Sequence, residues 1–152
     1  MKKEILHKPI RKVFLISCVG KKLDKFAPAK NLYISEWFQK AWAYCHQRSG
    51  MGTETYILSA KHGLLWCEEY VDPYELSLSD MPVSDRKAWA AKVYKSLADM
   101  ENLGGLQVVV LAGDKYREFL VPLLKAAGAV VKVPMAGLGI GEQLAYLKKN
   151  TP

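Results

Sequence analysis

The chain has 152 residues, of which 50% are hydrophobic and 24% charged, and its net charge is +7. These values are typical of a soluble globular domain and exclude an intrinsically disordered chain, and no apolar run approaches the roughly 18 residues of a membrane-spanning helix. Residues 1–12 are basic and lack the apolar segment of a secretory signal, so we expect a basic arm before one α/β domain (residues 13–152) in a cytoplasmic protein.

Four short, apolar runs are predicted to be strands, and they cover residues 13–19, 55–60, 107–112 and 129–134. None of them alternates cleanly between polar and apolar residues, which is typical of strands buried on both faces of a parallel sheet. The segments between these strands must therefore supply the helices that cover the two faces of the sheet.

Helical patterns separate the strands. The first covers residues 35–47, the second begins at Ser84 as its N-cap, the third begins at Asp114 as its N-cap, and the fourth covers residues 141–149. Pro122 lies inside the third, so a kink or an early break is expected there. With right-handed crossovers, this order predicts a three-layer α/β sandwich around a four-stranded, mostly parallel sheet with a Rossmann-like order.

Polar, basic and glycine residues gather where the predicted strands end. Ligands of open α/β sheets bind beyond the carboxyl ends of the strands, so these residues are the candidate substrate-binding set. The set contains Ser17, Cys18, Gly20, Lys21, Lys22, Tyr33, Ser35, Tyr74, Gly113, Tyr116, Gly139 and Gly141. Tyr33 and Tyr74 are the candidates for stacking on a base.

The end of the second strand carries a candidate catalytic group. Ser59, Lys61 and His62 bring together a hydroxyl, a cation and a side chain that titrates near neutral pH. His62 is the candidate general acid or base, with Glu69 or Asp72 of the following acidic stretch as a carboxylate partner. The alternative is a histidine that only caps local backbone.

Two features suggest a partner that carries phosphate. Residues 1–30 hold nine Lys and Arg residues against two acids, which equals the whole net charge of the chain. Lys21 and Lys22 follow Gly20, and glycines 137, 139 and 141 precede the last helix, where backbone amides can approach an anion or a flat ring. A solvated basic segment and a tight structural turn are the alternatives. The three cysteines form no CxxC pair, so neither a metal nor another cofactor is expected.

Several ordered motifs carry a resemblance to known proteins. LISC-GKK, ILSAKHGLL, DPYELSL, VVLAG--YRE and GLGIGEQLAYL together resemble a family of small bacterial and phage domains without assigned chemistry, over residues 13–147. Residues 58–76 are more distantly similar to the YaaA-type peroxide-stress proteins, a resemblance that implies DNA binding and protection from oxidative damage. The order of elements is also similar to that of uracil-DNA glycosylases, although their GQDPYH loop has no counterpart after the first strand.

Together these observations predict a protein that acts on a nucleotide or nucleic acid, with cleavage of an N-glycosidic bond or base exchange as the reaction. The alternative is a non-catalytic DNA-binding protein of a stress response, phage or mobile element, in which residues 2–30 contact phosphates. The enzyme hypothesis predicts that His62→Ala lowers turnover by about 10²-fold or more, and the DNA-binding hypothesis predicts almost no effect. The oligomeric state is left open.

Overall fold

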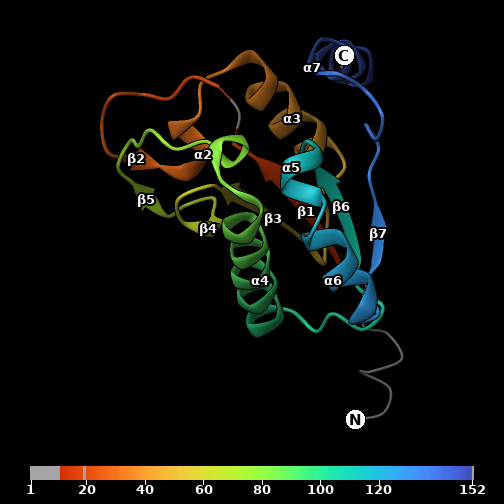
Figure 1. Ribbon diagram of the computed structural model, residues 1–152. Helices are drawn as coiled ribbons and strands as arrows, with labels where there is room; N and C mark the ends of the chain where they lie inside the picture. The colour runs from red at the N-terminus through yellow and green to blue at the C-terminus, as the bar shows by residue number, and fades with distance from the viewer. Residues whose placement is uncertain (1–10, 19, 152) are drawn as a thin grey trace.

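A central β-sheet organises the computed structural model, which describes residues 11–18 and 20–151 (Figure 1). In these residues the sheet has five strands in the order β4-β3-β1-β6-β7. The strands are β1 (Lys12–Ser17), β3 (Thr53–Ser59), β4 (Gly63–Trp66), β6 (Gln107–Leu111) and β7 (Val130–Lys132). Residues 1–10 of the predicted basic arm lie outside the described residues, while Lys12 is already the first residue of β1.

The sheet is parallel except at one edge. β1 pairs in parallel with β3 on one side and with β6 on the other, and β7 pairs in parallel with β6. β4 instead pairs antiparallel with β3 through a hairpin that turns at residues 60–62, with Ser59 opposite Gly63. The prediction of a mostly parallel sheet is therefore confirmed, and the prediction of four strands is wrong. The missed strand is only four residues long.

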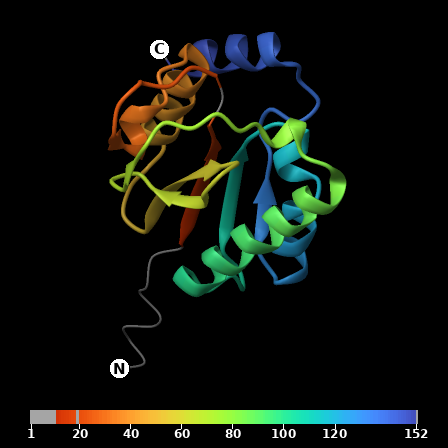
Figure 2. The same ribbon diagram turned by 60° about the vertical axis from the view of Figure 1, so that its left-hand side comes forward.

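Helices cover both faces of the sheet, as predicted. Phe14 and Ile16 of β1 pack into a core with α2 (Ala29–Leu32), α3 (Glu36–Gln47) and α7 (Ile140–Asn150). The alternate residues Val13 and Leu15 pack into a second core with α4 (Val83–Met100) and α6 (Leu120–Ala126). Figures 1 and 2 show α4 and α6 together on one side of the sheet, with α3 and α7 packed on each other. The three-layer α/β sandwich follows from the two-residue alternation of β1.

The helix ends confirm some predicted caps and correct others. Ser35 caps α3 as expected and accepts a hydrogen bond from the Phe38 amide. Ser84 is not the cap of α4, because the Pro82 carbonyl already accepts hydrogen bonds from the amides of residues 85 and 86 and starts the helix earlier. Asp114 is not a cap either, since Gly113 takes that position and the Asp114 carboxylate pairs with Arg117.

The helix predicted from residue 114 is broken, although not at its proline. α5 (Asp114–Arg117) ends before α6 begins at Leu120, so the break precedes Pro122. Pro122 lies in the first turn of α6, where its missing N–H removes no hydrogen bond from the helix. No described helix has the length and apolar character needed to cross a membrane.

Two shorter features sit beside the carboxyl edge of the sheet. β2 (Ala27–Pro28) and β5 (Tyr70–Val71) form a separate antiparallel pair, and the 3-10 helix η1 (Leu78–Asp80) follows β5. The segment that joins β5 to η1 crosses the upper part of the molecule in Figure 1. η1 contacts α5, so this connection closes over the strand ends.

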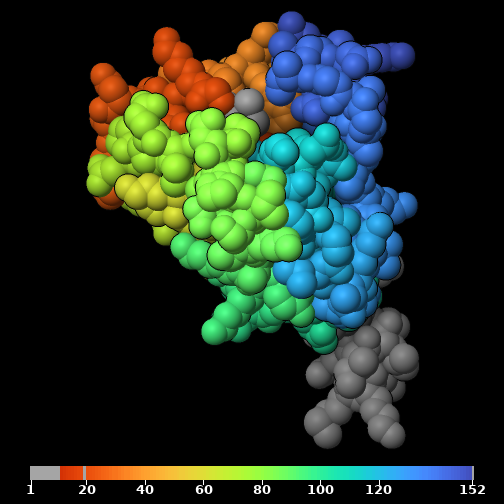
Figure 3. Space-filling view, viewed as in Figure 1, coloured from red at the N-terminus to blue at the C-terminus, as the bar shows by residue number. Residues whose placement is uncertain are grey.

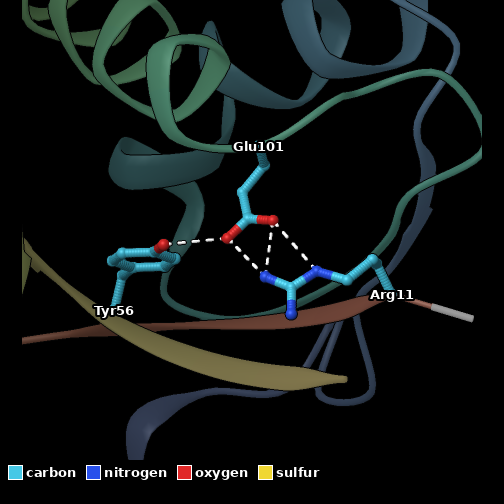
Figure 4. A network of polar contacts seen from close by, with 3 residues as sticks. All are labelled: Arg11, Tyr56 and Glu101. Atoms are coloured by element: carbon cyan, nitrogen blue, oxygen red, sulfur yellow. Dashed lines mark hydrogen bonds and ion pairs between the residues drawn. The ribbon is translucent and has the colours of Figure 1, made fainter. Parts of the chain in front are cut away.

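A charged cluster lies at the opposite, amino edge of the sheet (Figure 4). The Glu101 carboxylate, whose side chain is 6% exposed, accepts hydrogen bonds from Arg11 Nη2 at 2.7 and 2.8 Å. The same carboxylate accepts a 2.9 Å hydrogen bond from the Tyr56 hydroxyl. Burial first, and then this contact with Glu101, raises the pKa of Tyr56. The cluster ties the end of α4 to the start of β1.

Candidate functional site

A pocket of about 380 Å³ lies where β1 and β6 end. After β1 the chain continues to β3 on one side of β1, and it later returns to form β6 on the other side. The carboxyl ends of β1 and β6 therefore form the topological switch point at which open α/β sheets bind ligands. In Figure 3 the yellow-green surface around residues 75–82 meets the cyan surface of α5 beside this region. The pocket is lined by Cys18, Gly20, Lys22, Glu75, Leu76, Ser77, Asp80 and Tyr116.

The Cys18 thiol and the Tyr116 phenol contribute polar groups to the pocket. The Tyr116 hydroxyl lies 3.9 Å from Cys18 Sγ and donates a hydrogen bond of 3.4 Å to the Cys18 carbonyl. Trp89 of α4 packs edge-on against the Tyr116 ring and donates its indole N–H to the Ser59 carbonyl. This packing fixes the phenol in place. Cys18 and Tyr116 lie at the same edge of the sheet, as the predicted strand ends imply.

Behind the pocket, the Tyr74 hydroxyl is the centre of a buried hydrogen-bond cluster. It accepts a 2.7 Å hydrogen bond from Ser59 Oγ, and it lies 2.8 Å from the Tyr33 hydroxyl and 3.2 Å from Cys18 Sγ. A phenol has a single proton to donate, so Tyr74 donates to only one of the last two groups. The cluster therefore connects the Cys18 thiol, which faces the pocket, to residues from three other segments of the chain.

The tyrosines of this site remain protonated at physiological pH. Burial raises the pKa of Tyr33, Tyr74 and Tyr116, and the charge that Cys18 would carry as a thiolate raises each pKa further. All three phenols are therefore neutral rather than negatively charged. Tyr116 is the one of the three that lines the pocket, so a ligand meets its uncharged hydroxyl at the strand ends.

The outer wall of the pocket comes from residues 75–80, which the sequence analysis did not include in its candidate site. Arg86 of α4, which is 8% exposed, holds this wall in place. Its Nη1 donates to the Met81 carbonyl at 2.6 Å, and its Nε donates to the Glu118 carboxylate at 2.7 Å. One buried guanidinium thus links the end of η1 to the end of α5.

Gly20 and Lys22 form the side of the pocket that follows β1. Gly20 has a φ of +82°, and a Cβ atom there would lie 2.9 Å from the Cβ of Ser35. The Lys22 ammonium lies over the Tyr74 ring at 4.8 Å, which is a cation–π distance. The Ile34 amide donates to the Lys21 carbonyl at 2.8 Å and fixes the backbone of this loop, while the Lys21 side chain is exposed.

The structure places His62 beside the buried cluster rather than in the lining of the pocket. Its imidazole packs edge-on against the Tyr74 ring, and its backbone N–H donates to Ser59 Oγ at 3.0 Å. Burial lowers the pKa of His62, the cations of Lys61 and Lys92 lower it further, and only Glu69 opposes them. The imidazole is therefore neutral at pH 7.

The remaining predicted catalytic residues lie away from the pocket lining. Lys61 lines a separate shallow hollow on the α4 side of the molecule. The Glu69 carboxylate accepts a hydrogen bond from the Trp66 amide and closes a turn, and Asp72 is exposed. Ser17 is fully buried, and its hydroxyl has no hydrogen-bond partner among the described residues.

Of the predicted glycines, Gly20 lines the pocket, whereas Gly113, Gly139 and Gly141 do not. Gly113 is the N-cap of α5. The Gly139 amide, at the start of α7, donates to the carboxylate of Glu142 in the same helix. This amide is already occupied by a carboxylate from its own chain, and Gly141 lies inside the helix. The arrangement matches the tight structural turn left open in the sequence analysis.

The charges around the pocket differ from those expected of a phosphate site. Lys22 is the only cation among the lining residues, whereas Glu75 and Asp80 are both acidic and form no ion pair with a described residue. No group of three or more His, Cys, Asp or Glu side chains in the described part of the chain is placed to hold a metal ion. The site is therefore built for a small polar ligand that is neutral or cationic.

Comparisons with known proteins identify a family but no activity. A family of unknown function, DUF6884, matches residues 13–149 of the chain. No curated protein and no solved structure matches it. The pocket and its surroundings therefore supply the arguments about function.

Proposed function

Because the chain belongs to the DUF6884 family of unknown function, its role must be inferred from its own site, and we propose that it binds a nucleoside unit and acts on the N-glycosidic bond. The observation that carries this proposal is that two carboxylates, Glu75 and Asp80, line one pocket at the switch point together with the thiol of Cys18 and the phenol of Tyr116.

The size and polarity of the pocket support this ligand class. A volume of about 380 Å³ is at the small end of the range for ligand sites and suits a single nucleoside. A thiol and a phenol can hydrogen-bond the polar edge of a base, and carboxylates accept hydrogen bonds from the hydroxyl groups of a sugar. The excess of acidic over basic groups favours a nucleoside over a free nucleotide whose phosphate enters the pocket.

The proposed reaction is hydrolysis or base exchange at the anomeric carbon. The bond between this carbon and the base nitrogen breaks, its electron pair leaves with the base, and the base takes up a proton. Water, or a second base, forms the new bond to the anomeric carbon and gives up a proton. Glu75 and Asp80 would stabilise the positive charge that develops on the sugar, and one of them would accept the proton of the attacking water.

His62 has a different part in this proposal from the one that the sequence suggested. It reaches the pocket only through the Tyr74 ring, so it would act as a positioning residue for the buried cluster. Under the pocket-centred proposal, His62→Ala lowers turnover by only a few-fold. A loss of about 10²-fold or more would return His62 to the role of general acid or base.

The non-catalytic alternative has less support from the described residues. Arg11 and Lys12 lie at the amino end of β1 and Lys21 and Lys22 beyond its carboxyl end, so about 20 Å of strand separates these two pairs. Arg11 and Lys30 are also engaged in ion pairs with Glu101 and Glu68. The DNA-binding prediction, the resemblance to YaaA-type proteins and the bacterial or phage origin therefore stay predictions.

Nucleoside turnover tests the proposal directly. The purified chain is incubated with ribo- and deoxyribonucleosides of each base, and free base is measured by chromatography. We expect release of base from at least one nucleoside, with Glu75→Gln or Asp80→Asn lowering the rate by about 10²-fold or more. Asp99→Asn, which removes an exposed acid from α4, is the matched control and leaves the rate unchanged. The proposal fails if millimolar nucleosides neither release base nor bind in calorimetry.

A further inference from the structure

Exposed aromatic side chains gather at one corner of the molecule. Among the described residues, the large aromatic side chains that are more than half exposed are Phe26, Trp66 and Tyr70, at 57%, 54% and 59%. Phe26 immediately precedes β2, Trp66 ends β4 and Tyr70 begins β5. Exposed apolar surface of this kind costs solubility, and a cluster of it commonly marks a contact surface.

Two of these rings form an open pair. The ring centroids of Phe26 and Tyr70 lie 5.1 Å apart with an angle of 32° between their planes. The antiparallel pairing of β2 with β5, in which Ala27 faces Val71 and Pro28 faces Tyr70, holds the two rings side by side. Each ring stays more than half exposed, so contact between them leaves area for a further planar group.

The aromatic pair is connected to the pocket along two chain segments. Gly20 and Lys22 line the pocket, and Phe26 follows on the same segment; Glu75 lines the pocket, and Tyr70 precedes it on the other. Phe26 is four positions after Lys22, a span of at most about 14 Å. A chain molecule whose one unit occupies the pocket can therefore reach the rings with a neighbouring unit.

The charges of the first segment favour a polynucleotide as that molecule. Lys21 and Lys25 are exposed and form no ion pair with any described residue. Ammonium groups next to exposed rings are the combination by which single-stranded nucleic acids are held, with bases on the rings and phosphates on the cations. Bases of an intact duplex are stacked inside it and cannot reach such a platform.

We propose that Phe26 and Tyr70 form a stacking platform for a base of single-stranded nucleic acid, whose neighbouring nucleoside enters the pocket. This inference rests on the proposed function, because it names a polynucleotide as the carrier of the nucleoside. Lys21 and Lys25 contact the intervening phosphates.

Fluorescence anisotropy with labelled 12-residue DNA and RNA strands, and with the matching duplexes, tests the platform. We expect the single strands to bind more tightly than the duplexes. Replacing Tyr70 by Leu removes the ring but keeps an apolar side chain, and it weakens binding by about 10- to 100-fold, whereas Tyr70→Phe keeps the affinity. The Lys21→Gln and Lys25→Gln variants each lower the slope of log affinity against log salt by about 0.7.

Two controls separate the possible failures. Met51→Ala removes an exposed apolar side chain at the amino edge of the sheet and leaves binding unchanged. Free nucleosides are assayed with every variant, because Tyr70→Leu leaves their turnover intact if only the platform is affected. Nucleoside turnover without single-strand binding overturns the platform and leaves the pocket proposal standing. Equal affinity of the Tyr70→Leu and Tyr70→Phe variants for single strands overturns stacking on the Tyr70 ring. The exposed aromatic corner would then be a contact surface for a protein.

Discussion

The polar groups at the two ends of the sheet are hydrogen-bonded in different ways. At the amino edge, the charged Arg11 and Glu101 satisfy each other through three hydrogen bonds, and Tyr56 uses the same carboxylate. At the carboxyl edge, the groups around Tyr74 are thiol and hydroxyl groups, and the pocket opens beside them. The groups of the first cluster are paired with one another and stabilise the fold, whereas the second cluster lies beside a pocket and its thiol can also contact a ligand.

The largest expected effect on stability comes from breaking the charged cluster. Glu101→Ala leaves the Tyr56 hydroxyl buried without its acceptor and Arg11 without its counter-ion, so the free energy of unfolding should fall by about 3 kcal/mol. Urea unfolding measures this loss, and Glu101→Gln, which keeps one acceptor, should recover part of it. Because the cluster lies at the far edge of the sheet, nucleoside binding should not change. A weakened affinity in the folded variant would contradict the separation of the two ends.

The buried hydrogen-bond cluster around Tyr74 should respond in both stability and binding. Tyr74→Phe removes the hydroxyl that Ser59, Tyr33 and Cys18 share, and we expect it to cost about 2 kcal/mol of unfolding free energy. The same variant should weaken nucleoside binding, because Cys18 loses the contact that orients its thiol. Tyr44→Phe, which removes a hydroxyl contact to Tyr146 between α3 and α7, is the matched control and should leave binding unchanged. Unchanged binding in Tyr74→Phe would separate the cluster from the pocket.

Alkaline pH gives a smaller effect with a defined sign. Burial raises the pKa of Tyr33 and Tyr74 above the value of about 10 that phenols have in the unfolded chain. Above pH 10 the unfolded state therefore binds fewer protons than the folded state, and the free energy of unfolding falls as the pH rises. Urea titrations between pH 8 and 11 should show Tyr74→Phe with a slope shallower by up to about 1.4 kcal/mol per pH unit. Identical slopes for the variant and the parent would show that Tyr74 ionises as readily in the folded protein as in the unfolded chain.

The smallest effect belongs to a residue that neither cluster uses. Ser17 is fully buried beside Cys18, and its hydroxyl has no hydrogen-bond partner among the described residues. Ser17→Ala removes the unsatisfied oxygen with little loss of volume, so the variant should be as stable as the parent or more stable by about 1 kcal/mol. Differential scanning calorimetry measures this difference. A loss of more than 1 kcal/mol would show that the hydroxyl is engaged in solution.

The sequence allowed part of the site to be predicted because strand ends follow from hydrophobic patterning. The apolar runs 13–19 and 107–112 predict parallel strands, and parallel strands bring Cys18, Gly20, Lys22 and Tyr116 to one edge of the sheet. Their meeting at a single pocket needs one further fact, that β1 and β6 are neighbours. Strand order depends on contacts between distant segments, and a single sequence does not display it.

The rest of the pocket depends on interactions that leave no local pattern. Residues 75–80 reach the strand ends through a long connection whose path is fixed by the contact of Arg86 with the Met81 carbonyl. Such a contact has no spacing or composition that a sequence reader can recognise. His62 was placed at the correct edge, but the unexpected hairpin into β4 turns it against Tyr74. That hairpin has Ala-Lys-His at its turn rather than one of the common Asn-Gly or Asp-Gly pairs.

Gly20 has a consequence for how this chain tolerates mutation. Its backbone requires a left-handed conformation, and its missing side chain lets Ser35, the cap of α3, approach closely. Any other residue there would strain the loop and push against the start of a core helix. In a saturation library selected only for folding, position 20 should accept glycine almost alone, while the exposed Lys21 beside it should accept most residues. An invariant glycine at position 20 would therefore reflect the requirements of folding. The requirements of activity would instead appear as invariance at Glu75 and Asp80.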